Sequence, residues 1–142
     1  MSTYIPVSLR QRIVSLDARR CAYCQSPEAL MGVTFEIEHI IPISAGGSTS
    51  LDNLCLSCPT CNRYKATRTT AQDPESHVEV PLFHARRQNW TTHFAWSSDM
   101  TRVIGLTLNG RATIELFHIN RPVIVQLRQY WVVLRLHPSI SL

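Results

Sequence analysis

Two C-x2-C pairs constrain the fold of this chain more than any other feature of its sequence. Two cysteines at this spacing can direct both thiolates at one tetrahedral zinc ion, and two such pairs complete a closed site of four sulfurs. Because a closed site has no open position, its zinc is structural, and it contributes on the order of 10 kcal/mol to folding. We therefore predict a zinc-stapled fold whose ligands are Cys21, Cys24, Cys58 and Cys61.

A fifth cysteine, Cys55, extends the second pair into a C-x2-C-x2-C run. Such a run is also found in iron-sulfur proteins, but the C-x3-C-P continuation of bacterial ferredoxins does not follow Cys61. A redox dithiol is a further alternative, although it leaves one of the two pairs unexplained. Between Leu54 and Leu56, Cys55 is more economically interpreted as a small buried apolar residue.

The first half of the chain predicts short elements on both sides of the cysteine pairs. Residues 8–19 have apolar positions at helical spacing, with Ser8 as the N-cap. Apolar and β-branched residues predict strands over 35–43 and 54–57, and Pro59 opens a predicted helix over 59–67. The long interval between the pairs leaves residues 35–53 free to form a second site.

A polar connector over residues 67–76 separates this part from a C-terminal region of different character. That region predicts strands over 90–96 and 102–108, then a helix with Asn120 as its N-cap and Pro122 in its first turn. The predicted apolar stripe of this helix is Val123, Leu127, Trp131 and Leu134. We expect an α+β protein with a core over residues 1–72 and an accessory extension over 73–142.

The charge balance favours a polyanionic partner. The 142 residues carry fourteen basic and ten acidic side chains, and thirteen of the fourteen bases are arginine, which binds phosphate oxygens bidentately. No stretch has the roughly 18 apolar residues of a membrane span, and the first residues lack the pattern of a secretory signal. We expect a cytoplasmic protein, where clustered cysteines more often bind metal than form disulfides.

The residues between and after the cysteine pairs carry a family resemblance. Glu38-His39 precedes Ile40-Ile41-Pro42, Asn53 lies in the middle, and Asn62 follows the last cysteine. Over residues 21–65 the sequence resembles HNH endonucleases of the zinc-containing type. The resemblance implies a ββα-metal fold with Glu38 and His39 on the first strand and Asn62 on the helix. It also implies DNA cleavage products that end in 3'-hydroxyl and 5'-phosphate.

Phosphodiester hydrolysis explains why these residue types belong together. His39 suits the general base because imidazole titrates near neutrality, and Asn53 is expected to hold it by hydrogen bonding. Oxygen ligands from Glu38 and Asn62 suit Mg²⁺ or Mn²⁺, with Glu36 as a competing ligand. Since neighbouring strand residues point to opposite faces, Glu38 and His39 can serve one phosphate only if the strand bends or bulges.

We expect Arg63 and Lys65 to be exposed on the same helix as Asn62 and to contact backbone phosphates of DNA. The sequence thus predicts a metal-dependent DNA endonuclease with structural Zn²⁺ and catalytic Mg²⁺ or Mn²⁺. The alternative is a non-catalytic zinc module that binds nucleic acid, in which Glu38 and Asn62 are structural.

Overall fold

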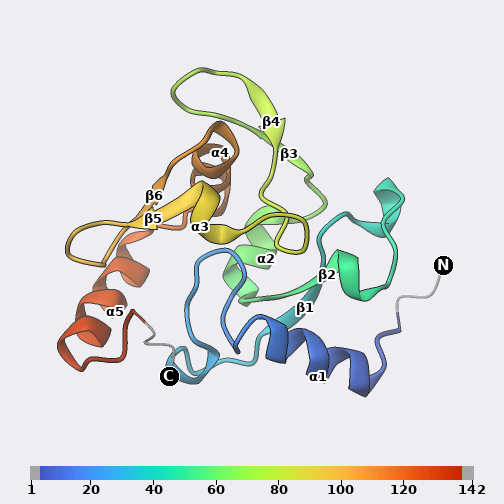
Figure 1. Ribbon diagram of the computed structural model, residues 1–142, viewed down its shortest axis with the longest axis horizontal. Coiled ribbons are helices and arrows are strands. Elements are labelled where there is room, and N and C mark those ends of the chain that lie inside the picture. Colours follow the sequence, from blue (N-terminus) through green and yellow to red (C-terminus); the bar gives the residue numbers. More distant parts are fainter. Residues whose placement is uncertain (1–3, 139–142) are drawn as a thin grey trace.

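A computed structural model describes residues 4–138 as a mixed α+β protein (Figure 1). Within these residues the strands form three separate two-stranded antiparallel sheets. The elements in chain order are α1 (Val7–Leu16), β1 (Glu36–His39), β2 (Leu54–Ser57), α2 (Pro59–Lys65), β3 (Thr70–Gln72), β4 (Glu79–Pro81), α3 (Trp90–His93), β5 (Phe94–Trp96), β6 (Val103–Gly105), α4 (Leu108–Phe117) and α5 (Pro122–Val133). Short 3₁₀ turns occur at Glu28–Leu30, Ile43–Ala45 and Leu51–Asn53.

The hairpin β1–β2 and helix α2 form the unit around which the first half is built (Figure 1). The predicted strand over 54–57 is confirmed, whereas the predicted strand over 35–43 ends at His39. Pro42 precedes a 3₁₀ turn, so the chain leaves the extended conformation there. The register of the hairpin is continuous from Glu36↔Ser57 to His39↔Leu54, so no bulge interrupts β1.

Helix α1 is shorter than predicted and begins differently. Ser8 lies inside the helix rather than at its N-cap, which is Pro6 without a side-chain hydrogen bond. The helix ends at Leu16, and Ala18 and Arg19 follow with positive φ angles. This reversal takes the chain directly to Cys21, the first residue of the first cysteine pair.

The predicted apolar stripe of α5 is correct at Trp131, which is buried, and at Leu127, which packs on the core, but wrong at its other two residues. Its buried face consists of Ile124, Val125, Arg128 and Trp131, whereas Val123 and Leu134 are exposed. The buried face of α5 includes Arg128 because its guanidinium donates to the carbonyl oxygens of Thr101 (3.0 Å) and Ile119 (2.9 Å). An arginine can occupy a core only when such acceptors satisfy it, and the sequence pattern could not reveal them.

The C-terminal strands also differ from their predicted ranges. Residues 90–93 form the short helix α3, so β5 is confined to Phe94–Trp96, where it pairs with β6. Asn120 does not cap α5. Its side chain accepts from the Val103 amide and donates to the Val103 carbonyl, both at 2.8 Å, so it ties β6 to the start of α5.

One hydrophobic core crosses the predicted boundary between residues 72 and 73. Buried residues of the first half, such as Tyr23 and Leu56, belong to the same cluster as Phe83, Phe94 and Phe117. Tyr23 and Phe117 pack edge to face with ring centroids 4.3 Å apart. The C-terminal region therefore completes the core of the N-terminal region, and the division into 1–72 and 73–142 stays a prediction.

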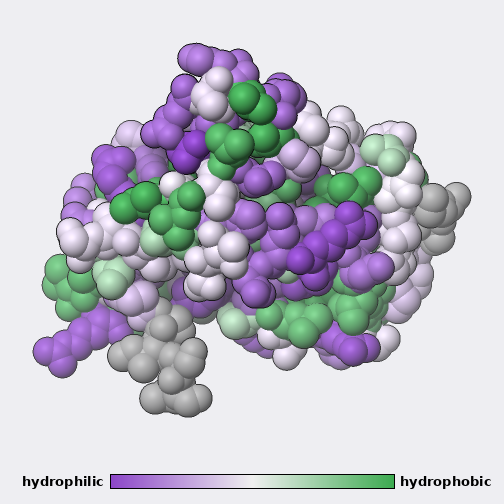
Figure 2. All heavy atoms as spheres, turned by 45° about the horizontal axis from the view of Figure 1, so that its top comes forward, coloured by the Kyte–Doolittle hydropathy of each residue, from purple (hydrophilic) through white to green (hydrophobic). Residues whose placement is uncertain are grey.

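Hydrophilic side chains are interspersed with separate apolar patches on the face drawn in Figure 2. Among residues 4–138 no helix has the length and apolar character needed to cross a bilayer.

Candidate functional site: a four-cysteine centre and a groove at the end of β1

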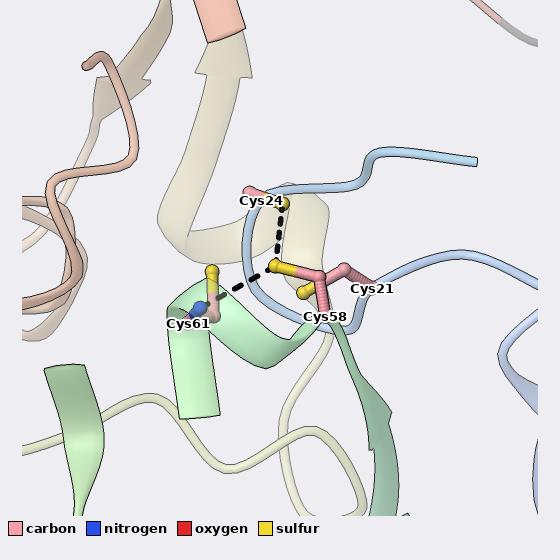
Figure 3. A group of neighbouring side chains, drawn as sticks. All are labelled: Cys21, Cys24, Cys58 and Cys61. Carbon is pink, nitrogen blue, oxygen red and sulfur yellow. Dashed lines mark hydrogen bonds between the residues drawn. The ribbon is translucent and has the colours of Figure 1, made fainter. Parts of the chain in front are cut away.

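The four predicted zinc ligands lie together in the protein interior. The sulfurs of Cys21, Cys24, Cys58 and Cys61 all lie within 4.8 Å of one another, and all four residues are buried (Figure 3). A tetrahedral zinc with Zn–S bonds of about 2.3 Å separates its sulfurs by about 3.8 Å. The 3.9 Å between the sulfurs of Cys24 and Cys58 matches that spacing, so the donor set fits a structural zinc ion.

Local structure explains how the two pairs meet. The Cys21 carbonyl accepts from the Gln25 amide at 3.0 Å, which closes a turn that brings Cys21 and Cys24 to the same side. Cys58 is the N-cap of α2, and its sulfur accepts from the Cys61 amide. Arg121, at the start of α5, donates to the sulfur of Cys58 at 3.9 Å and brings positive charge to the thiolates. The fifth cysteine, Cys55, is buried outside the centre, in agreement with its interpretation as a buried residue.

A groove brings together three of the predicted site residues: Glu38, His39 and Asn62. It lies where β1 ends and α2 passes over the hairpin, and it is also lined by Ile37, Pro42, Ile43, Ser44, Ala66 and Thr67. Both Glu38 and His39 line the groove and the hairpin register has no bulge, but the Glu38 carboxylate turns inward to Lys65 while the His39 ring turns to Thr49.

His39 is held by a residue that the sequence did not single out. Its Nε2 lies 2.9 Å from the hydroxyl oxygen of Thr49, in the loop that leads to β2. Partial burial lowers the pKa of His39, and the positive charge of Lys65 lowers it further. The ring is therefore neutral at neutral pH, which is the form that can accept a proton.

Glu38 is almost fully buried and strongly engaged. Its Oε2 accepts hydrogen bonds from Tyr23 and Cys55, and its Oε1 forms an ion pair with Lys65 Nζ at 2.8 Å. Burial raises the pKa of Glu38, while the Lys65 charge and these hydrogen bonds oppose the shift. The carboxylate thus has one oxygen fixed by neutral donors and one that faces a cation.

Asn53 acts on the loop rather than on the His39 ring itself. Its amide accepts from the Ile41 amide (2.9 Å) and donates to the carbonyls of Ile41 (2.9 Å) and Ser48 (2.8 Å). These contacts close the loop that begins one residue after His39 and contains Thr49. Any effect of Asn53 on His39 is therefore transmitted through the backbone.

Asn62 lies on α2 facing the other carboxylate of β1. Its Nδ2 donates to Glu36 Oε2 at 2.5 Å, in a solvent-exposed position. Arg63, the next residue, is exposed as expected. Lys65 contradicts the expectation of exposure: only 1% of it is accessible, since its ammonium turns inward to Glu38 and to the His39 carbonyl. It therefore does not belong to a phosphate-binding surface.

The residues that sequence reasoning missed are Tyr23, Thr49 and Cys55, each of which contacts Glu38 or His39. Tyr23 stands between two predicted zinc ligands, and Cys55 pairs with Glu38 across the predicted hairpin. These positions were available signals for Tyr23 and Cys55. Nothing in the sequence pointed to Thr49.

Comparison with known proteins agrees with this geometry. The family model described as HNH endonuclease matches residues 21–68, which include both cysteine pairs, β1, β2 and α2. A comparison with curated proteins gives no match. This family indicates a nuclease or another nucleic-acid-related function. Residues 21–68 of this chain therefore match the HNH endonuclease family model, and they contain four cysteines positioned to form a zinc site.

Proposed function

We propose that this protein is an endonuclease that hydrolyses DNA phosphodiester bonds with a divalent metal ion and His39 as general base. The observation that carries the proposal is that Glu38, His39 and Asn62 line one groove inside the segment that matches the HNH family. A base, a carboxylate and an amide oxygen are the groups that metal-assisted hydrolysis of a phosphodiester needs.

His39 has the protonation state that a base requires, and its contact with Thr49 allows the tautomer that leaves Nδ1 unprotonated. When Nε2–H donates to the Thr49 hydroxyl, Nδ1 is the nitrogen left to take a proton from water. The lowered pKa of His39 keeps Nδ1 unprotonated at neutral pH. Asn53 contributes by holding the loop that carries Thr49.

Glu38 and Asn62 are the proposed ligands of Mg²⁺ or Mn²⁺. Oε1 of Glu38 is buried and ion-paired with the Lys65 ammonium at 2.8 Å, so the ion is proposed to bind there in place of the ammonium. Asn62 gives its Nδ2 to Glu36, so its Oδ1 is the atom left for a cation. When bound, the ion supplies positive charge to the scissile phosphate and to the leaving oxygen.

DNA is the proposed partner, and Arg63 is proposed to contact its phosphates from the exposed side of α2. The arginines of the C-terminal region are proposed to add contacts that do not depend on base sequence. The proposed cellular location is the cytoplasm, where thiolates remain reduced and available to zinc.

Cleavage of supercoiled plasmid by zinc-loaded protein tests the proposal, with Mg²⁺, with Mn²⁺ and with a chelator of divalent ions that leaves the zinc in place. We expect nicking or linearisation that requires the added ion, and a loss of about 10²- to 10⁴-fold in His39→Ala. His77→Ala is the matched control, because His77 is exposed in the turn between β3 and β4.

DNA binding without cleavage by the zinc-loaded wild type, across both metals and several DNA substrates, would contradict the proposal. That result would favour a non-catalytic zinc module, in which the Glu38–Lys65 pair is a structural ion pair.

A further inference from the structure

An exposed aromatic pair joins α2 to the end of α4. The rings of Tyr64 and His118 pack with their centroids 4.4 Å apart and an angle of 37° between their planes. Tyr64 is 40% accessible and His118 is exposed, so the pair presents aromatic surface to solvent. The two elements that carry this Tyr64–His118 stack, α2 and α4, pack against each other (Figure 1).

The backbone around each ring is anchored in the interior. His118 follows Phe117 and precedes Ile119, neither of which has accessible surface, and Lys65 next to Tyr64 is 1% exposed. His118 ends α4 in the left-handed conformation, with φ 48° and ψ 50°, which an L-residue adopts only where its surroundings require it. The buried neighbours therefore fix the places from which the two rings project.

The position of Tyr64 on α2 relates the stack to the groove. Because an α-helix has 3.6 residues per turn, Asn62, Arg63 and Tyr64 follow one another around α2 in steps of about 100°. Asn62 lines the groove, Arg63 is exposed, and Tyr64 meets His118 on the side away from the groove. A helix with its side chains is about 10–12 Å across. One nucleic-acid strand that crosses α2 can therefore contact the groove, Arg63 and the stack in turn.

Positive charge flanks the stack. On the side of α2, Arg63 and Arg68 are both exposed. On the side of α4, Arg121 donates to the His118 carbonyl at 3.3 Å. The acidic residue of α4, Glu115, lines a depression that also contains Arg68. Aromatic rings among arginines are the combination that binds single-stranded nucleic acid, in which the rings stack on bases and the basic groups attract phosphates.

We propose that the Tyr64–His118 stack is a stacking site for an unpaired nucleobase of the DNA substrate. The inference rests on the proposed function, and it adds a preference for DNA that contains unpaired bases. In a duplex each base is already stacked between its neighbours, whereas a base in a single strand or a frayed end offers its face directly. Every base has such a face, so the site adds affinity without reading sequence.

Binding of zinc-loaded protein to a single-stranded oligonucleotide of about 16 nucleotides, and to the duplex of the same sequence, tests this inference. Fluorescence anisotropy measures the affinity in a chelator of divalent ions that leaves the zinc in place. Tyr64→Leu keeps an apolar side chain but removes the ring. We expect about 5- to 100-fold weaker binding of the single strand in Tyr64→Leu and a smaller loss for the duplex. Tyr64→Phe keeps the ring and should bind like the wild type.

Salt dependence separates stacking from charge. Tyr64→Leu should leave the slope of log K against log salt unchanged, because it removes no phosphate contact. Tyr130→Leu is the matched control, since Tyr130 is 56% exposed on α5, and it should change neither affinity. If Tyr64→Leu loses zinc or stability, His118→Asn decides the test. Asparagine tolerates the left-handed conformation but has no aromatic ring, so this variant should also bind the single strand more weakly.

Wild-type affinity for the single strand in both Tyr64→Leu and His118→Asn would overturn the stacking role, and so would an equal loss for single strand and duplex. Either result leaves the proposed nuclease in place if plasmid cleavage still requires the added ion. Single-strand binding that depends on Tyr64, in a protein that cleaves no DNA, would support the stacking role and contradict the nuclease. The two failures can therefore be told apart.

Discussion

The four-cysteine centre and the groove differ in the type and the burial of the side chains that form them. The centre uses four identical soft ligands that are all buried, and its sulfurs are already at zinc spacing. The groove combines an imidazole, a carboxylate that is buried and ion-paired with Lys65, and an exposed amide at the end of a strand. The centre is a closed set of one ligand type, whereas the groove is open to solvent and lined by side chains of different chemistry.

Replacing one zinc ligand should have the largest effect, and it distinguishes the role of the four-cysteine centre from that of the groove. Cys58→Ser should lose zinc and unfold the domain, since metal binding supplies on the order of 10 kcal/mol and Cys58 also caps α2. Zinc content and thermal melting by circular dichroism measure the effect. Cys55→Ala is the control and should keep its zinc, and a folded, active Cys58→Ser protein would refute the four-cysteine assignment.

Asn53→Ala should damage the groove while leaving the centre intact. The change removes three part-buried hydrogen bonds, to the Ile41 amide and to the carbonyls of Ile41 and Ser48, each worth about 0.5–1.5 kcal/mol. We expect lower stability to urea and reduced cleavage with normal zinc content. Thr92→Ala, in the exposed part of α3, is a control that should change neither quantity.

The rate of the proposed cleavage should depend on pH through the protonation of His39. A base works when unprotonated, and the folded-state pKa of His39 is below its ordinary value. Activity should therefore be flat near neutral pH and fall about tenfold per unit only below His39's own pKa, under about 6.5. Initial cleavage rates from pH 5 to 8 at saturating metal measure this. An acidic limb above pH 7 would contradict the assignment of His39 as the base.

Arg63→Gln should have the smallest effect, because Arg63 is exposed on α2 and is proposed only to contact DNA phosphates. If this exposed arginine contacts one phosphate, its loss weakens DNA binding moderately for all sequences and reduces the salt dependence by about one ion. Binding titrations at several salt concentrations measure both effects. Arg10→Gln, on α1, serves as a charge-matched control, and an equal loss there would indicate a general charge effect.

The same contrast explains how far the sequence could be interpreted. The cysteine spacing predicted the zinc ligands because the C-x2-C unit is local: a turn closed by Gln25 and an N-cap on α2 suffice to direct each pair. The strand at Leu54–Ser57 and the helix that starts at Pro59 were predictable for the same reason. The burial of Lys65 was not, because it depends on Glu38, which is 27 positions earlier in the chain.

The sequence by itself determined the identity of the metal-binding cysteines, the order of β1, β2 and α2, and the resemblance to HNH endonucleases. These properties depend on residue type and on spacing within a few residues. Only the tertiary structure decided that Tyr23 and Cys55 donate hydrogen bonds to Glu38. It also decided that Thr49 contacts the His39 ring and that Arg128 lies on the buried face of α5. Each of these contacts joins residues distant in the chain, and a buried polar group is stable only where the fold brings it a partner.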